Sequence, residues 1–216
     1  MGFHLIDLAG WERAEHFRHY RAAVPCGYSV TVSLTITRLL SGIREGGYRL
    51  YPTLIYLLAR LVNAHREFRL ALSEEGEVGY FDEMVPSYTV FHPDSETFSN
   101  LWTPYSADFS AFCRAVQADM DQYGRDKAFF AKPGGPKNQF PISCAPWTAF
   151  TGFHIHLFSD ADYLFPMFTI GRYGEENGEI RLPLAMQIHH AAADGFHTGR
   201  LLEELQELCS HPKLFL

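Results

Sequence analysis

Cysteine is scarce in this sequence. Only 4 of its 216 residues are cysteine, and none of them forms a C-x-x-C pair with another. Zinc ribbons and disulfide frameworks need several cysteines at short, regular spacings. The pattern argues against both classes, and we expect reduced thiols at Cys26, Cys113, Cys144 and Cys209.

Long apolar runs and an excess of positive charge are also missing. No stretch approaches the roughly 18 consecutive apolar residues of a membrane span. The N-terminal stretch MGFHLIDLAGWERAEHF has no basic region followed by an apolar core, which argues against a secretory signal. The formal net charge is -7, which favours neither nucleic acid nor an anionic membrane as partner. We expect a cytoplasmic protein that binds a small molecule or another protein.

What is present suits one domain that covers residues 1–216. Apolar residues make up 47% of the chain, enough for a substantial core. Aromatic residues make up 15%, with 18 Phe and 11 Tyr, which is more than an average core uses. A binding pocket lined by aromatic rings is therefore expected.

The apolar periodicity mixes helices and strands in irregular order. Spacings of three and four predict helices at 10–23, 51–68, 106–126 and 197–209. Strand patterns occur at 28–37, twice within 76–92, and at 148–158, 165–173 and 180–190, with a turn at 174–179. The fold class that follows is α+β, a two-layer sandwich of helices on a mixed, mainly antiparallel sheet.

The segment MQIHHAAADGFH, residues 186–197, holds three histidines and one aspartate. If 182–190 is a strand, its alternation puts His190 on the apolar face with Ile188, and His189 on the more polar face. Partial loss of hydration favours neutral imidazole, so His190 is the better general base at neutral pH. Equally compatible is a structural histidine beside an aspartate, Asp194, that caps the following helix.

Several segments together resemble one family along nearly the whole chain. These segments are WERAEHFRHYR, VPCGYSVTVSLTIT, YPTLIYLLARLVN, YTVFHPDSETFS, NQFPISCAPWTAFTGF, FPMFTIGRY and LPLAMQIHHAAADGFHTGRLLEELQELC. At compatible spacing they are similar to the trimeric chloramphenicol acetyltransferases, which have a CoA-dependent acyltransferase fold. The resemblance implies acetyl transfer from acetyl-CoA to the primary hydroxyl of chloramphenicol, without a metal, in a homotrimer whose sites lie between subunits.

The resemblance also implies a role for each catalytic residue. His190 matches the general base, Ser143 the serine that hydrogen-bonds the oxyanion, and Thr169 the threonine that assists through a water. Asp194 matches an aspartate held by an arginine, here Arg13, in a pair that braces the site. Acyl transfer to an alcohol needs such a base and such a donor, and it needs no covalent nucleophile.

Two sets of binding residues follow from the same resemblance. The acceptor-binding positions are Tyr20, Cys26, Tyr28, Thr89, Phe98, Phe130 and Phe153. The CoA-binding positions are Arg49, which would meet a phosphate, Trp147, and Tyr173, which would stack on adenine. Taken singly, each aromatic ring could equally be ordinary interior filling.

The sequence departs from the family near the acceptor site. Pro141 stands where relatives often carry asparagine, and proline offers no side-chain hydrogen bond. Ser87 replaces a longer polar residue, whereas Ala193 replaces a frequent cysteine without evident consequence. The acceptor is therefore less firmly implied than the reaction.

Three alternatives stay open on sequence grounds. A metal protein would use His154 and His156 with one of His189, His190 or His197. A non-catalytic protein of the same fold would bind an aromatic ligand, although both His190 and Ser143 are retained. An acetyltransferase of this fold acting on a different hydroxylated acceptor is the third alternative.

Overall fold

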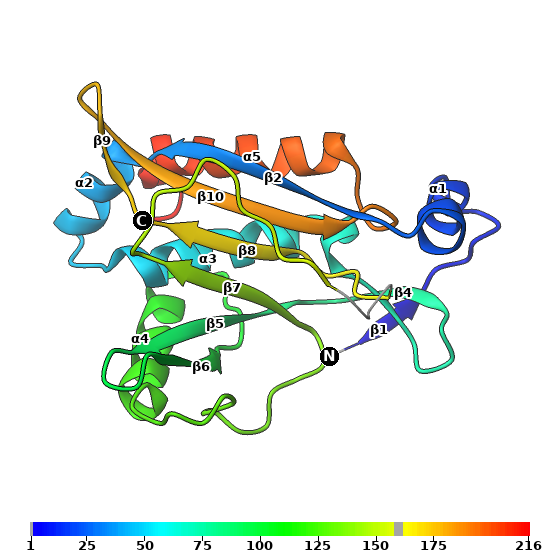
Figure 1. The fold of residues 1–216 in the computed structure, drawn as a ribbon, viewed down its shortest axis with the longest axis horizontal. Helices are drawn as coiled ribbons and strands as arrows, with labels where there is room; N and C mark the ends of the chain where they lie inside the picture. The colour runs from blue at the N-terminus through cyan, green and yellow to red at the C-terminus, as the bar shows by residue number, and fades with distance from the viewer. Residues whose placement is uncertain (1, 158–161) are drawn as a thin grey trace.

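The computed structural model describes residues 2–157 and 162–216. Its main element is a seven-stranded sheet with strand order β2-β10-β8-β7-β5-β6, in which β9 also pairs with β10 (Figure 1). The strands are β2 (Gly27–Thr35), β5 (Val85–His92), β6 (Thr97–Trp102), β7 (Gln139–Ala145), β8 (Met167–Gly171), β9 (Gly174–Glu176) and β10 (Glu179–His189). The pairs β5·β7 and β7·β8 are parallel and the others antiparallel, so the predicted mixed, mainly antiparallel sheet is confirmed.

Helices cover one face of this sheet. They are α2 (Thr37–Glu45), α3 (Leu50–Ala64), α4 (Phe109–Tyr123) and α5 (Gly195–Ser210). Helix α3 is central, and Leu57, Ala59 and Val62 are inaccessible to solvent in the core that it forms with the strands and with α4 and α5. No helix in the described ranges is long and apolar enough to cross a membrane.

A smaller sheet lies at one end of the molecule (Figure 1). It consists of β1 (Phe3–Leu5), β4 (Val78–Phe81) and β3 (Leu70–Leu72), all antiparallel. Beside it, α1 (Ala14–Arg18) continues into a π-helical turn (His19–Ala23), and a 3-10 helix (Arg66–Arg69) follows α3; another (Pro212–Leu214) follows α5. The sequence patterns predicted β4 but neither β1 nor β3.

The turn between β9 and β10 confirms the prediction made at 174–179. Asn177 and Gly178 have positive φ angles of 54° and 79°. Two successive residues of positive φ suit the tight hairpin turn whose twist matches that of the strands, and Asn-Gly is its favoured sequence. The turn sets the register of β9 with β10, and β10 then runs between β2 and β8.

The strand predicted at 148–158 is wrong over 148–157, and Phe158 lies outside the described residues. The backbone of Ile155 instead pairs with a side chain: its N–H donates to Oε1 of Gln187 at 2.8 Å, and its carbonyl accepts from Nε2 at 2.6 Å. The amide of Gln187 thus replaces a neighbouring strand. Helix α2 and strands β6 and β7 were missed. Strand β10 ends at His189, so His190 belongs to the turn that follows.

Leu57→Ala should lower the free energy of unfolding by about 2–5 kcal/mol, because truncating a fully buried leucine loses apolar burial and leaves a cavity. Urea unfolding followed by far-UV circular dichroism measures the change. Leu5→Ala is the control, since Leu5 is 56% exposed and should change little. Equal losses for the two variants would contradict this placement of the core.

Candidate active site

The face of the sheet away from the helices carries the two predicted oxyanion residues. In register, Ser143 of β7 pairs with Thr169 of β8, and Thr169 pairs with Ala185 of β10. Their neighbours in sequence, Ile142, Phe168 and Met186, are buried in the core on the helix face. Because side chains alternate along a strand, Ser143 and Thr169 lie side by side on the opposite, open face.

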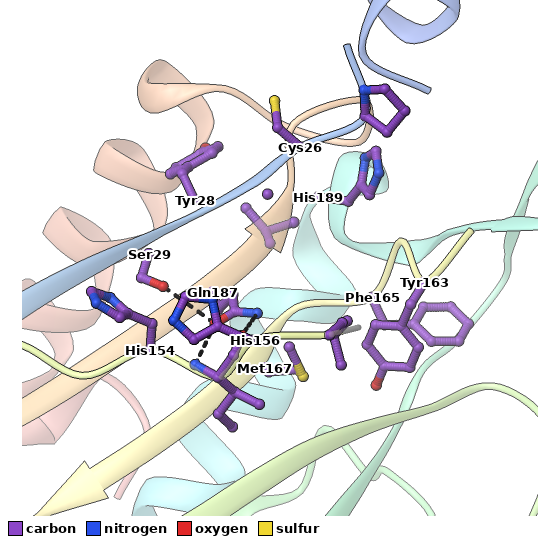
Figure 2. A pocket seen from close by; sticks show the side chains of 15 residues that line it. Cys26, Tyr28, Ser29, His154, His156, Tyr163, Phe165, Met167, Gln187 and His189 are labelled. Carbon is purple, nitrogen blue, oxygen red and sulfur yellow. Dashed lines mark hydrogen bonds between the residues drawn. The ribbon is translucent and has the colours of Figure 1, made fainter. Parts of the chain in front are cut away.

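A cavity of about 700 Å³ opens on this face where β2 and β10 meet the segment 154–157. Figure 2 shows Ser29 and Gln187 directed toward the side on which His154 and His156 lie. Ser29 Oγ donates to Gln187 Oε1 at 3.3 Å. Sequence reasoning missed Gln187, although its place two residues before His189 on β10 puts it on the same face.

His190 lies on the helix side of the sheet, as the alternation predicted. Its N–H donates to the Cys26 carbonyl at 2.9 Å. Its ring stacks on Tyr20 with centroids 3.8 Å apart and a 4° tilt, and the Tyr28 ring meets it at 5.2 Å. Among the described residues, its buried Nδ1 has no hydrogen-bond partner.

The exposure of the two adjacent histidines is the reverse of what the alternation suggested. His189, on the open face, is only 8% exposed, whereas His190 is half-buried. The ring of His189 folds back onto the chain, where its Nδ1 accepts from the N–H of Ala191 at 3.1 Å. Strand alternation thus predicted the face of each residue but not its exposure.

His190 and Ser143 consequently lie on opposite faces of the same sheet. Tyr28, which contacts the His190 ring, reaches Thr198 of α5 with its hydroxyl at 3.4 Å, and Figure 2 shows it on the helix side of β2. The strands themselves separate the predicted base from the predicted oxyanion donor. In one chain the two groups are therefore not part of one pocket.

Arg13 and Asp194 are brought together from the two ends of the chain. The Nη1 of Arg13 donates to Asp194 Oδ2 at 2.6 Å, and Asp194 Oδ1 accepts from the N–H of Phe196 at 3.1 Å at the start of α5. Burial raises the pKa of Asp194, but the lowering by Arg13 and His197 is larger. The net pKa of this carboxyl therefore lies below its ordinary value. The carboxylate is thus held ionised between a guanidinium and a helix N-terminus.

The predicted acceptor residues fall into separate groups. Tyr20, Cys26 and Tyr28 surround His190. The N–H of Phe153 donates to Thr31 Oγ1 at 3.3 Å, which places it over β2. The remaining three, Thr89, Phe98 and Phe130, lie on or beside β5 and β6. Phe98 and Phe130 are 45% and 75% exposed.

Two of the predicted CoA residues stand at neighbouring strand ends. Trp147 and Tyr173 each follow their strand, β7 or β8, by two residues and are 57% and 50% exposed. A hydrogen bond of 2.8 Å from Arg172 N–H to the Thr148 carbonyl joins the two segments. These two exposed rings lie just beyond the ends of β7, which carries Ser143, and of β8. Flat aromatic rings of this kind fit the flat base of a nucleotide. Arg49 is exposed at the start of α3.

The four cysteines are free, as predicted. Burial raises the pKa of Cys113 and of Cys209 to about 12, and it raises the pKa of Cys144 above its ordinary value. These three thiols stay protonated at neutral pH and are poor nucleophiles. A covalent acyl-enzyme on them is not favoured.

The proposed histidine metal site gains no support from the described parts of the chain. There, no group of three or more His, Cys, Asp or Glu side chains is placed to hold a metal ion. The rings of His154 and His156 lie 5.7 Å apart, and the segment that carries them is not a strand. His197 is engaged with Asp194 at 2.7 Å.

Comparison with known proteins identifies the family of this chain. The family model described as "Chloramphenicol acetyltransferase" matches residues 1–206. Chloramphenicol acetyltransferases from Vibrio anguillarum and Campylobacter coli are 50% and 49% identical over 96% of this chain, covering 94% and 99% of the relatives.

Solved structures show the same fold. A chloramphenicol acetyltransferase structure superimposes with a TM-score of 0.89 at 22% identity, covering 96% of this chain and 100% of that one. The Azotobacter vinelandii dihydrolipoamide acetyltransferase gives 0.67 at 18% identity, covering 94% and 88%. The predicted CoA-dependent acyltransferase-like fold is thus confirmed. This chain belongs to the chloramphenicol acetyltransferase family.

Proposed function

We propose that this protein transfers the acetyl group of acetyl-CoA to the primary hydroxyl of chloramphenicol, conferring resistance to the antibiotic. Family membership over residues 1–206 carries the reaction and its acetyl-CoA co-substrate. All of residues 1–216 form one acetyltransferase domain in this proposal. We assign it to the cytoplasm, because acetyl-CoA is available there.

His190 is the general base in this proposal. Its Nδ1 is enclosed by the chain, and its ring is held between Tyr20 and Tyr28. The other ring nitrogen, Nε2, is then the atom left to take the proton of the acceptor hydroxyl. A neutral imidazole can do this at pH 7 and can later return the proton to the departing thiolate.

Ser143 stabilises the charge that develops on the thioester oxygen. Its hydroxyl stands on the open face, beside Thr169, which assists through a bound water. A fixed donor is most valuable where charge appears only in the transition state. Trp147 and Tyr173 at the adjoining strand ends, with Arg49, would hold the coenzyme so that its acetyl group meets Ser143.

The active protein is a homotrimer in this proposal, with each site shared between two subunits. His190 and Ser143 occupy opposite faces of the sheet, so a copy of the chain must bring its own His190 to the Ser143 face of its neighbour. Oligomers with cyclic symmetry repeat such a contact at every interface. The same contact would unite the separated acceptor residues in one pocket.

The purified protein should acetylate chloramphenicol with acetyl-CoA, and His190→Ala should lower kcat by about 10² to 10⁴-fold, because it removes the base. Thiol release followed with a chromogenic reagent, together with identification of the acetylated product, measures the reaction. His211→Ala, which alters an exposed histidine, is the control and should keep full activity.

Ser143→Ala should lower kcat by about 10²-fold or more with little change in KM, because its hydrogen bond forms chiefly in the transition state. A folded His190→Ala variant with normal kcat would contradict the assignment of the base. Transfer to another alcohol, with no transfer to saturating chloramphenicol, would contradict the acceptor.

Asp194→Ala should destabilise the protein by about 1–3 kcal/mol, because it leaves the partly buried Arg13 without its partner. The pKa of Asp194 is lower in the folded chain than in the unfolded chain, so its contribution is complete above about pH 4. The contribution falls as the pH drops through the folded pKa.

Urea unfolding at several pH values measures this stability difference between wild type and Asp194→Ala. The difference should be largest near neutral pH and should narrow below about pH 4. Asp121→Ala, which alters an exposed aspartate on α4, is the matched control. A difference that stays constant down to the lowest pH would refute the ionised brace.

A further inference from the structure

A second cavity, of about 220 Å³, lies on the open face toward the start of β7. Ser87 of β5, Asn100 and Trp102 of β6, and Gln139 of β7 form its floor, and the segment around Phe130 and Lys132 forms its rim. Ser87 pairs in register with Trp102 on one side and with Pro141 on the other. Of the two acceptor-site positions at which the sequence departs from the family resemblance, Ser87 lines this cavity and Pro141 lies beside it on β7.

The position of this cavity along β7 fits a substrate that reacts at Ser143. Gln139, Pro141 and Ser143 alternate onto one face of the strand. At about 3.3 Å per residue along β7, Pro141 is roughly 7 Å and Gln139 roughly 13 Å from Ser143, and Ser87 lies abreast of Pro141 on the neighbouring strand. If the reacting hydroxyl of an acceptor lies beside Ser143, the opposite end of that acceptor would reach this cavity.

The polar groups of this cavity are two half-buried side-chain amides. Within the described ranges, the side chains of Asn100 and Gln139 make no hydrogen bond to the protein. A Cβ built at Gly135 would lie 2.4 Å from Nε2 of Gln139, so in this conformation the amide packs directly against the backbone of Gly135. Two amide NH₂ groups are thus available as donors to a ligand.

The cavity offers no free charge. The ammonium of Lys132 is 2.7 Å from Asp119 Oδ1 and 4.2 Å from the centre of the Trp102 ring, so its charge is already compensated. Trp102 Nε1 donates to the Lys132 carbonyl at 3.3 Å, which ties the rim to β6. An aromatic wall with neutral donors suits a planar, uncharged group that carries acceptor oxygens.

We propose that Asn100 and Gln139 are specificity-determining residues that bind the nitroaryl end of the acceptor. This inference rests on the proposed function, since it assumes that chloramphenicol is acetylated beside Ser143. The two amides supply hydrogen bonds at a site where Pro141 has no side-chain donor and Ser87 is short. Neither residue contacts the reacting atoms.

The test compares chloramphenicol with the analogue that has hydrogen in place of the nitro group. Asn100→Leu and Gln139→Met remove the amides at nearly constant volume, so both variants should fold, as thermal melting would verify. Each variant should lower kcat/KM for chloramphenicol by about 2- to 10-fold, the effect of one neutral hydrogen bond. The analogue should be unaffected, as should the KM for acetyl-CoA.

Gln117→Met, at a half-buried amide on α4 outside the cavity, is the matched control and should leave kcat/KM unchanged for both acceptors. If wild type acetylates chloramphenicol but the Asn100 and Gln139 variants leave kcat/KM unchanged, or lower it equally for both acceptors, the subsite assignment is wrong and the proposed function stands. If wild type acetylates neither acceptor but acetylates another alcohol, the proposed function fails and this inference fails with it.

Discussion

The alternation of side chains across one sheet is the constraint on which the candidate site depends. On β7 and β8 it directs Ser143 and Thr169 away from the helices, whereas beyond the end of β10 it leaves His190 on the helix side. A shift of one residue in any of these registers would exchange the faces. The helix layer can cover only one face, so the other remains available for a second copy of the chain.

Segments near the two ends of the chain hold His190, the proposed base, in place. Asp194 starts α5 and meets Arg13, which lies just before α1, so a single ion pair connects the two segments that flank His190. Tyr20 follows α1 directly and stacks on the His190 ring. The position of the proposed base therefore depends on contacts between residues far apart in sequence, and the loss of the Asp194 carboxylate should disturb both stability and catalysis.

Local patterns predicted most of the regular structure because these segments have one buried face. The alternation at Val30, Val32 and Leu34 appears as β2, and the stripe from Phe109 to Val116 appears as the buried side of α4. Helix α2 was missed because Gly42 and short polar residues obscure the pair Leu39 and Ile43, which is buried.

The error at 148–157 shows the limit of periodicity, since a pattern that alternates Phe153, Ile155 and Leu157 with two histidines fits a strand without supplying a partner strand. In this chain the partner of Ile155 is the side chain of Gln187.

The candidate site was less accessible to sequence reasoning than the fold. Strand alternation predicted the faces of His189 and His190 correctly, but it did not predict that His189 would be the more buried of the two. The pair of Arg13 and Asp194 is 181 residues apart, and only the family resemblance suggested it. Asn100 and Gln139 lie on β6 and β7, two strands that the sequence patterns did not predict, and only the registers of β5, β6 and β7 bring them to one cavity.

Subunit complementation tests the central claim most directly. His190→Ala and Ser143→Ala chains, each nearly inactive alone, would be unfolded, mixed in equal amounts and refolded together. If each site takes its base from one copy and its oxyanion donor from another, about a quarter of the sites in random mixed oligomers are intact, and acetyl transfer returns to about a quarter of the wild-type rate. Mixed oligomers that form but stay as inactive as either variant alone would show that both groups act from the same chain.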